Sequence, residues 1–410
     1  MSSLSQPVAS IQKAAQRIPG IDLLRGLCIV AVVLHHTNLR IRFNQSSFGK
    51  LLSPAADHIL FWSGYYGVIV FFVISGFLIT TWSLKRWGSL RQLSLRQFYQ
   101  MRFARIVPCL LGLLLILSVL DRAGVPRFTI NTQHTSLGRA LLAALTFHIN
   151  WLEAHTGYLP ANWDVLWSLS VEEVFYVFFP LLCVLLRKQA FIIGLLCCFV
   201  LIGPFARVQT QNQLWADYGY FSCMDGIALG CLAAMLAAQI RLSRKANLAL
   251  RIAGSLFCIL IVFFRSAAGR LGLYKPSLNV TVLELGAAFL MIALQQRFEE
   301  KSAAGLSLTN SNAYGLRSAT YTLWRSAGFL RWFGRNSYEV YLTHMFVIWP
   351  MVIAFQHFQW SINLAPLLFL VTAAIAGIVG YAVARFYSEP LNRRLRRQWL
   401  PRKKATAAED

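Results

Sequence analysis

The apolar stretch from Arg25 to His36 carries an arginine at its start and a pair of histidines at its end. Arg25 and His36 are eleven positions, or three helical turns, apart. They therefore share one helix face and lie about 16 Å apart along the axis. Asp22 lies on this face too, whereas His35 points about 100° away. Because ionisable residues inside a membrane helix are costly, these residues predict a functional polar path. The alternative is that Arg25 is a snorkelling anchor and His36 an interfacial residue.

Ser75 and Gly76 interrupt the apolar run GVIVFFVISGFLITT, which extends from Gly67 to Thr81. A serine in this position could act as a nucleophile, and a glycine could admit a ligand or another backbone. Small residues also let helices approach one another closely, so helix packing is the competing interpretation of both residues.

Arg102 and Arg105 are three positions apart in the segment FYQMRFARIVP. This spacing places both side chains on one helix face, at the mouth of a predicted span. Two neighbouring guanidinium groups suit a phosphate, which they can bind through several parallel hydrogen bonds. The alternative is that both arginines only anchor the helix on the cytoplasmic side.

Glu172 and Glu173 lie well inside another apolar segment, NWDVLWSLSVEEVFY. Two adjacent acids are expensive at that depth, so at least one should face a polar interior. Glu172 is four residues from both Ser168 and Tyr176, so these three side chains can share one face. Trp167, about one and a half turns before the acids, is typical of a membrane interface.

Several further ionisable or aromatic residues inside apolar segments are candidates for a substrate path. Asp225 and Glu284 each stand alone in such a segment. Tyr338 and His344 belong to NSYEVYLTHMFVIWP, and Glu389 ends the last apolar segment in RFYSEP.

The composition indicates the kind of fold that positions these residues. Hydrophobic residues make up 57% of the 410 residues, charged residues only 13%, and the mean hydropathy is +0.53. These values are typical of a multi-pass membrane protein. We therefore expect an all-α bundle of about ten spans, near residues 22–38, 64–84, 104–121, 166–186, 190–207, 219–239, 248–264, 278–297, 338–356 and 364–386. Segment 137–151 is apolar but too short to span, and is expected to be re-entrant or interfacial.

The basic residues predict the orientation of this bundle. Of the 39 Lys and Arg residues, 29 lie in the segments that would be cytoplasmic if both termini are inside. We expect a cytoplasmic tail over 1–20, a transmembrane catalytic domain over 21–388 and a basic cytoplasmic tail over 389–410. The net charge of +23 therefore reflects topology, and no nucleic-acid partner is expected. The eight cysteines show no metal-ligand spacing, so neither a metal site nor a disulfide is predicted. No cleavable signal pattern precedes the first span.

Six segments, taken together and in this order, resemble the acyltransferase-3 family of membrane-bound O-acyltransferases. They are IDLLRGLCIVAVVLHH, GVIVFFVISGFLIT, FYQMRFARIVP, LWSLSVEEVFY, NSYEVYLTHMFVI and FYSEP. The family pattern of an arginine, ten residues and a histidine falls on Arg25 and His36. Its Phe-Phe-x-x-Ser-Gly and Arg-x-x-Arg elements fall on Phe71, Phe72, Ser75, Gly76, Arg102 and Arg105.

The resemblance implies a function for these residues. Acyl-coenzyme A, with acetyl as the expected acyl group, would arrive from the cytoplasm with Arg102 and Arg105 near its phosphates. His36 would be catalytic, as a base or as an acyl carrier. Arg25 would hold a phosphate or an acid near the path, and Glu172 would orient the imidazole or line the acceptor site.

The acceptor implied by the resemblance is a hydroxyl of an exported or lipid-linked sugar, in a bacterial inner membrane. Some family members carry an additional extracytoplasmic domain. This chain ends about two dozen residues after its last predicted span, so it is expected to act alone or with a separate extracytoplasmic partner. The alternatives are acylation of a small molecule such as a macrolide, and a transporter or acyl exporter without transfer chemistry.

Overall fold

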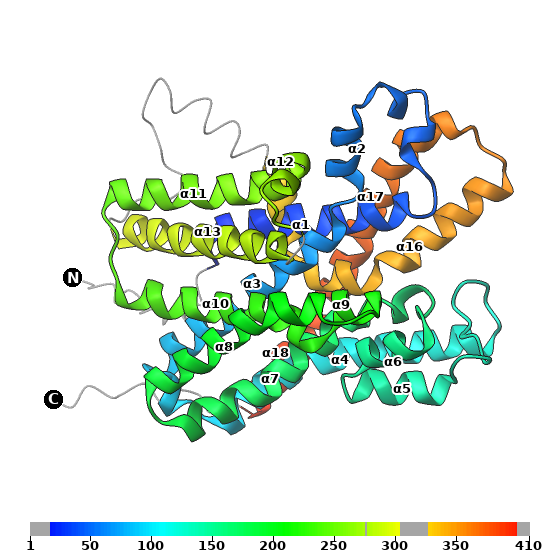
Figure 1. Ribbon diagram of the computed structural model, residues 1–410. Coiled ribbons are helices and arrows are strands. Elements are labelled where there is room, and N and C mark those ends of the chain that lie inside the picture. The colour runs from blue at the N-terminus through cyan, green and yellow to red at the C-terminus, as the bar shows by residue number, and fades with distance from the viewer. Residues whose placement is uncertain (1–16, 275–276, 304–326, 400–410) are drawn as a thin grey trace, which may run out of the picture.

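Ten long helices form the protein in the computed structural model, which describes residues 17–274, 277–303 and 327–399 (Figure 1). All ten are long and apolar enough to cross a membrane, which confirms the predicted all-α bundle. Each overlaps one predicted span. They are α1 (Pro19–Asn38), α3 (Gly64–Trp87), α4 (Leu95–Arg122), α7 (Leu166–Leu186), α8 (Gln189–Val208), α10 (Tyr220–Gln239), α11 (Arg244–Phe263), α13 (Leu278–Ala303), α16 (Ser337–His357) and α17 (Ala365–Val383).

Among the described residues, seven shorter α-helices lie between or after the long ones. They are α2 (Pro54–Phe61), α5 (Leu137–Leu145), α6 (Ile149–Thr156), α9 (Gln213–Tyr218), α12 (Arg265–Arg270), α15 (Gly328–Arg335) and α18 (Glu389–Trp399). The predicted segment 137–151 is divided between α5 and α6, both too short to span a bilayer. The count of ten is thus reached without it.

Ten crossings place the start of α1 and the end of α17 on the same side of the bundle, which we call the termini side. The opposite side carries α2, α9 and α12, because each of these helices joins two spans at the far end. Residues 1–16 of the predicted N-terminal tail, 304–326 of the predicted inner loop and 400–410 of the predicted C-terminal tail lie outside the described residues.

The long helix α1 runs through the middle of the bundle and packs against α3, α15, α16 and α17 (Figure 1). Small residues make its closest crossing possible. A Cβ atom at Gly26 would overlap the Leu330 carbonyl of α15, and one at Gly334 would overlap the Asp22 carbonyl of α1. Backbone contact of this kind is typical of helix association in membranes, where no difference in hydrophobicity drives packing.

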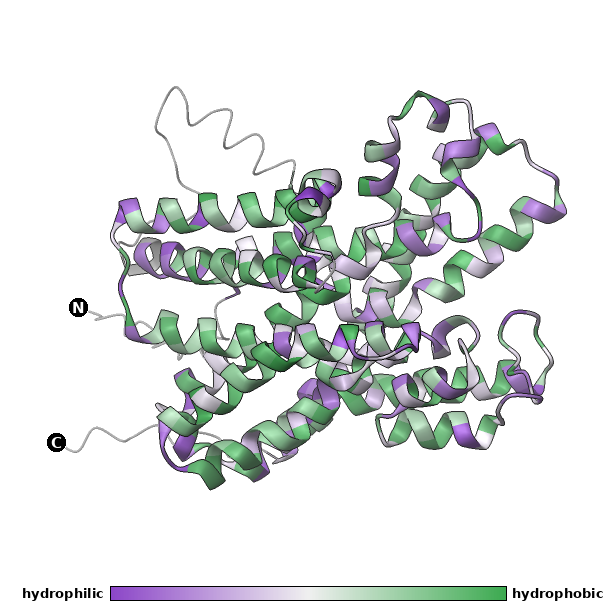
Figure 2. Ribbon diagram, viewed as in Figure 1, coloured by the Kyte–Doolittle hydropathy of each residue, from purple (hydrophilic) through white to green (hydrophobic). Residues whose placement is uncertain are grey.

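The helices α3 and α10 also approach closely through contacts between a glycine and a backbone carbonyl. A Cβ atom at Gly76 would overlap the Ile227 carbonyl of α10, and one at Gly230 would overlap the Val73 carbonyl of α3. The outer surfaces of the long helices are apolar, and hydrophilic residues gather at their connections (Figure 2). Large side chains such as Leu115, Leu185 and Phe205 are exposed on these surfaces, as expected where lipid replaces water.

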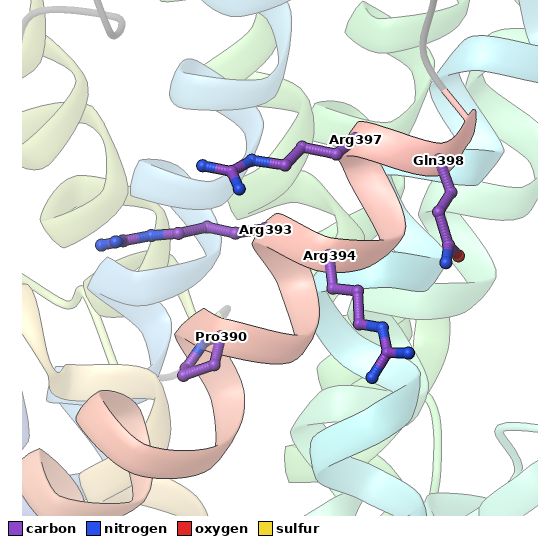
Figure 3. A pocket seen from close by; sticks show the side chains of 5 residues that line it. All are labelled: Pro390, Arg393, Arg394, Arg397 and Gln398. Carbon is purple, nitrogen blue, oxygen red and sulfur yellow. The ribbon is translucent and has the colours of Figure 1, made fainter.

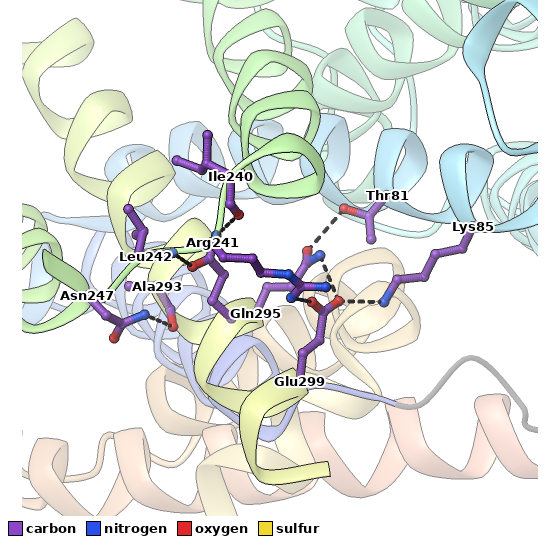
Figure 4. Close-up of polar contacts among 10 residues, drawn as sticks. Thr81, Lys85, Ile240, Arg241, Leu242, Asn247, Ala293, Gln295 and Glu299 are labelled. Carbon is purple, nitrogen blue, oxygen red and sulfur yellow. Dashed lines mark hydrogen bonds and ion pairs between the residues drawn. The ribbon is translucent and has the colours of Figure 1, made fainter. Parts of the chain in front are cut away.

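A polar cluster fixes three segments to one another on the termini side (Figure 4). Glu299 of α13 pairs with Lys85 of α3 at 3.1 Å and with Arg241, which follows α10, at 2.8 Å. Gln295 donates to Glu299 at 3.1 Å, and Thr81 donates to Gln295 at 3.3 Å. Because Glu299 binds groups from both other segments, this cluster holds the ends of α3, α10 and α13 together.

Substituting Gly76 by alanine tests the α3–α10 contact. The added methyl group would meet the Ile227 carbonyl, which is backbone and cannot turn aside. Overpacking of this kind costs about 1–3 kcal/mol, so we expect a lower apparent unfolding temperature in detergent. Gly194→Ala in α8 is the matched control, since no atom lies within 4 Å of its added methyl group. Equal unfolding temperatures for the two variants would contradict the assignment.

Candidate active site

The face of α1 that carries Arg25 and His36 packs against α16. Arg25 Nε and Nη2 donate to Ser337 Oγ at 3.1 and 2.8 Å. Eleven residues further on, the His36 ring lies 4.9 Å from that of His344, measured between centroids. Both partners belong to α16, so Arg25 and His36 share one face, as their spacing predicts. Asp22, one turn before Arg25, is buried on the termini side of the same helix.

The acceptors around the two histidines define which ring nitrogens carry protons. His36 Nδ1 is 3.0 Å from the Val32 carbonyl oxygen, and His344 Nδ1 is 2.6 Å from the Tyr341 carbonyl oxygen. A carbonyl can only accept, so each neutral ring carries its proton on Nδ1. His344 Nε2 lies 3.3 Å from His36 Nδ1 and can share that proton. His36 Nε2 is left with a free lone pair, which suits a base or a nucleophile.

His35 is directed away from this pair. Its Nδ1 lies 3.1 Å from the Phe61 carbonyl oxygen, and its ring meets the edge of Trp62 at a centroid distance of 5.8 Å. This direction agrees with the angle predicted from helical geometry.

Tyr341 connects the histidine pair to the start of α7. Its hydroxyl lies 2.8 Å from Ser168 Oγ and donates to the Val165 carbonyl oxygen at 3.1 Å. Ser337, Tyr341 and His344 lie at positions i, i+4 and i+7 of α16, so one face of that helix supplies these contacts to α1 and α7. Ser337 and Tyr341 were not predicted as site residues, although their helical spacing to His344 indicates that the three share one face.

A pair of neighbouring acids, Glu153 and Asp164, lies on the side opposite the termini. Glu153 of α6 is adjacent to Asp164, and its Oε1 accepts from the Leu159 backbone nitrogen at 3.0 Å. Burial and the neighbouring Asp164 raise the pKa of Glu153 well above its ordinary value, which favours the protonated form of its side chain. Arg40 attracts Asp164 and donates to the His36 carbonyl oxygen at 3.2 Å. It therefore links the acids to the end of α1.

A second polar cluster lies between Arg25 and the termini side. Ser75 Oγ donates to Glu172 Oε2 at 3.0 Å and contacts the Tyr176 hydroxyl, which donates to the same oxygen at 3.3 Å. The Arg102 guanidinium stacks over the Tyr176 ring at 4.2 Å. Both Arg102 and Arg25 attract the Glu172 carboxylate. Of the two adjacent glutamates, Glu172 is therefore the one whose side chain joins this polar cluster.

Arg105, predicted to act beside Arg102, is bound to a buried carboxylate. Its Nη1 lies 3.3 Å from Glu339 Oε1, which also accepts from Ser388 Oγ at 2.7 Å. Ser388 ends a π-helical turn over Ala384–Ser388, which lets the motif FYSEP reach α16. Tyr338 faces α4 and donates to the Ile106 carbonyl oxygen at 3.3 Å. The sequence contained Glu339, but nothing in its spacing connected it to Arg105.

The helix α18 brings further arginines to this end of the site. It packs along α4, and Arg396 is close enough to Arg86, Arg102 and Arg105 to be repelled by all three. A pocket of about 420 Å³ beside α18 is lined by Arg393, Arg394, Arg397, Pro390 and Gln398 (Figure 3). Glu389 pairs with Arg393 at 2.7 Å. The cations gathered here outnumber Glu339 and Glu389, as in a site for a multiply charged anion.

Other predicted residues lie apart from His36. Asp225 pairs with Arg207 at 2.8 Å, beside Glu284, in a cluster of α8, α10 and α13. Arg207, the last residue of the predicted span 190–207, is almost fully buried in α8. Gly76 contacts the α10 backbone. Aromatic packing accounts for Phe72, whose ring meets the edge of Trp167, and Trp167 stacks on Tyr218 at 4.0 Å. Phe71 packs partly buried against the same core.

Within the described part of the chain, no group of three or more His, Cys, Asp or Glu residues could hold a metal ion. The residues described above are histidines, acids and arginines, which can transfer protons and bind anions. They run from the arginines of α4 and α18, through Glu172 and Arg25, to His36 and the acid pair.

A comparison with protein families identifies the class. The acyltransferase-3 family model, described as an acyltransferase domain, matches residues 18–385, which is nearly the whole chain. The chain therefore belongs to the acyltransferase-3 family, which confirms the family and the enzyme class predicted from its motifs.

The chain is also similar to individual curated proteins. The chain is 26% identical over 350 residues to the peptidoglycan O-acetyltransferase OatA of Listeria monocytogenes, covering 81% of this chain and 49% of the relative. It is 27% identical over 358 residues to the putative peptidoglycan O-acetyltransferase YrhL of Bacillus subtilis, covering 81% and 48%. It is 24% identical over 272 residues to the O-acetyltransferase OatA of Staphylococcus aureus, covering 60% and 40%.

The chain thus spans less than half the length of these relatives. No solved structure matches it.

The acid pair predicts a particular pH dependence of stability. Folding raises the pKa of Glu153, so the folded protein binds this proton more tightly than the unfolded chain does. The resulting contribution to the free energy of unfolding is fully present below the ordinary pKa of 4.5 and is lost as the pH rises toward the raised pKa. Glutamine cannot ionise. Between about pH 5 and pH 9, the apparent unfolding temperature of the wild type should therefore fall more than that of Glu153→Gln. Glu300→Gln, which removes an exposed carboxylate, should follow the wild type. Parallel curves for wild type and Glu153→Gln would refute this account.

Proposed function

We propose that this protein is an integral-membrane O-acetyltransferase that moves an acetyl group from cytoplasmic acetyl-coenzyme A to a hydroxyl of an extracytoplasmic glycan. The observation that carries the proposal is the row of polar residues from the arginines of α4 and α18 to His36, whose Nε2 is free. Family membership and the names of the relatives support the chemistry and the class of acceptor.

The termini side is assigned to the cytoplasm. Support comes from the distribution of basic residues, since the sequence has 29 of its 39 Lys and Arg residues in the segments predicted to be cytoplasmic. The protein is a multi-pass membrane protein, and we place it in the bacterial inner membrane. Residues 21–388 would form the catalytic unit between two cytoplasmic tails. Asp164 and Glu153 would then face the extracytoplasmic side, where an exported or lipid-linked sugar arrives.

The donor would bind at the cytoplasmic end. Coenzyme A carries several phosphate charges, and guanidinium groups bind phosphate through paired, charge-assisted hydrogen bonds. Arg102 is the predicted residue best placed for this, because Arg105 is already paired with Glu339. Arg396 joins it from α18. The thioester arm would extend past Tyr176 and Glu172 toward Arg25.

His36 would transfer the proton that the reaction releases. As the acceptor oxygen attacks the thioester carbonyl carbon, His36 Nε2 takes the hydroxyl proton. The carbon–sulfur bond then breaks, and the imidazolium returns the proton to the leaving thiolate, so an acetyl ester and free coenzyme A result. Val32 and His344 hold the other ring nitrogen in the required tautomer. If His36 instead carries the acetyl group, the same nitrogen is acylated first.

Replacing His36 tests this assignment. His36→Ala should reduce transfer of labelled acetyl from acetyl-coenzyme A to the envelope glycan by at least about 100-fold, because proton transfer contributes about that much. Mass spectrometry of the glycan should show the loss of acetyl units. His35→Ala is the matched control and should retain most activity, since His35 is turned toward Phe61 and Trp62. Full activity of inserted His36→Ala protein would sink the mechanism and favour a transport function.

Replacing the donor arginines tests the cytoplasmic site. Arg102→Gln and Arg396→Gln should each raise the KM for acetyl-coenzyme A about tenfold, the size of one lost charge-assisted hydrogen bond, while kcat changes little. Arg91→Gln, an exposed arginine on the same side, should leave KM unchanged. An unchanged KM in both donor variants would remove the role assigned to these residues.

A further inference from the structure

A second pocket, of about 330 Å³, lies on the side opposite the termini, among α2, α8, α9, α12 and the start of α13. Its size is at the lower end for small-molecule sites. The pocket does not include His36, but it is close to it. Trp62, which lines the pocket, packs against His35, and the His35 ring lies 5.6 Å from that of His36.

Aromatic side chains form much of the wall. Trp62, Tyr65, Tyr66 and Tyr274 all line the pocket. Tyr65 and Tyr66 are anchored, because the Tyr65 hydroxyl donates to the Asp217 carbonyl oxygen at 3.3 Å and Asn279 Nδ2 donates to the Tyr66 hydroxyl at 3.4 Å. Fixed rings of this kind offer flat apolar surface at low entropic cost.

Charged and neutral polar groups complete the lining. Arg265 donates to His58, whose pKa is lowered by burial and by Arg265, so the imidazole is neutral and accepts. The Asp217 carboxylate accepts from Gln213 at 2.9 Å through one oxygen. Arg207 forms part of the lining and is neutralised from behind by Asp225. The pocket therefore presents a cation and an anion to whatever occupies it.

Tyr274 provides the most specific evidence for a ligand. Its hydroxyl lies beside that of Tyr66, but makes no hydrogen bond of good geometry with any described residue and is shielded from solvent. Burial raises its pKa to about 12, so it remains a neutral donor and acceptor. A buried hydroxyl without a partner is costly, and a ligand hydroxyl or amide would satisfy it.

These features select one chemical class. An acyl chain would cover Arg265, Asp217 and Tyr274 with apolar surface and form no hydrogen bond with any of them. A phosphate would be repelled by Asp217 and gains nothing from the aromatic wall. A sugar ring has an apolar C–H face that can lie on an aromatic ring, and hydroxyls that both donate and accept. We infer that this pocket binds a pyranose unit of the acceptor glycan, next to the unit whose hydroxyl is placed at His36. The inference rests on the proposed function for the identity of the acceptor.

Saccharide binding to the whole protein in lipid nanodiscs tests the pocket separately from catalysis. The probe is chitotetraose, an oligomer of N-acetylglucosamine, titrated by calorimetry and by tryptophan fluorescence. The wild type and His36→Ala should bind it equally. Tyr274→Phe should weaken binding about three- to tenfold, the size of one net hydrogen bond, and Arg265→Gln by about tenfold or more. Arg270→Gln, an exposed arginine of the same short helix, should bind as the wild type does.

A stability measurement excludes a merely structural role for Tyr274. Without saccharide, Tyr274→Phe should unfold at the same temperature as the wild type or higher, because it removes a buried hydroxyl that lacks a partner. A lower unfolding temperature with unchanged saccharide binding would overturn the inference, as would equal weakening by Arg270→Gln. Absence of binding in a preparation that transfers acetyl would overturn the pocket and leave the proposed function intact. Saccharide binding by a protein that transfers no acetyl would support the pocket and contradict the proposed function.

Discussion

The contact between α1 and α16 is the constraint on which the rest of the site depends. A membrane interior gives an arginine or a histidine no water, so each must find its partner within the protein. Arg25 finds Ser337 and His36 finds His344, and both partners lie on one face of α16. The glycine contacts of α1 with α15 and α3 hold α1 where these bonds can form. The polar row is therefore a consequence of helix packing as much as of the residues that compose it.

The sequence predicted the helices well because span length and hydrophobicity are local properties. It also predicted that Arg25 and His36 share a face, since helical periodicity determines that. It could not predict which helices meet. Glu339 was missed as the partner of Arg105, and Arg396 as a neighbour of Arg102, because these contacts join segments far apart in the chain. Ser337 and Tyr341 could have been found from their spacing to His344. Asp225 was predicted to line the path because it stands alone in an apolar segment, and its ion pair with Arg207 of another helix could not be read from the sequence.

The two ends of the molecule differ in chemistry. The termini side gathers more cations than acids around α4 and α18, whereas the opposite side has paired acids, aromatic rings and a nearly charge-balanced pocket. A phosphate-rich donor and an uncharged, hydroxyl-rich acceptor differ in the same way. This asymmetry supports transfer across the membrane, with His36 closer to the acceptor and Arg102 closer to the donor. Glu172 and Arg25 lie between them and would guide the thioester arm.

Transfer between two sealed compartments tests this account most directly. The protein would be reconstituted into vesicles with a glycan acceptor enclosed and labelled acetyl-coenzyme A added outside. We predict acetylated glycan inside the vesicles, formed by the molecules whose termini face outward, and none from His36→Ala. Acetylation that occurs only when donor and acceptor share one compartment would contradict the account.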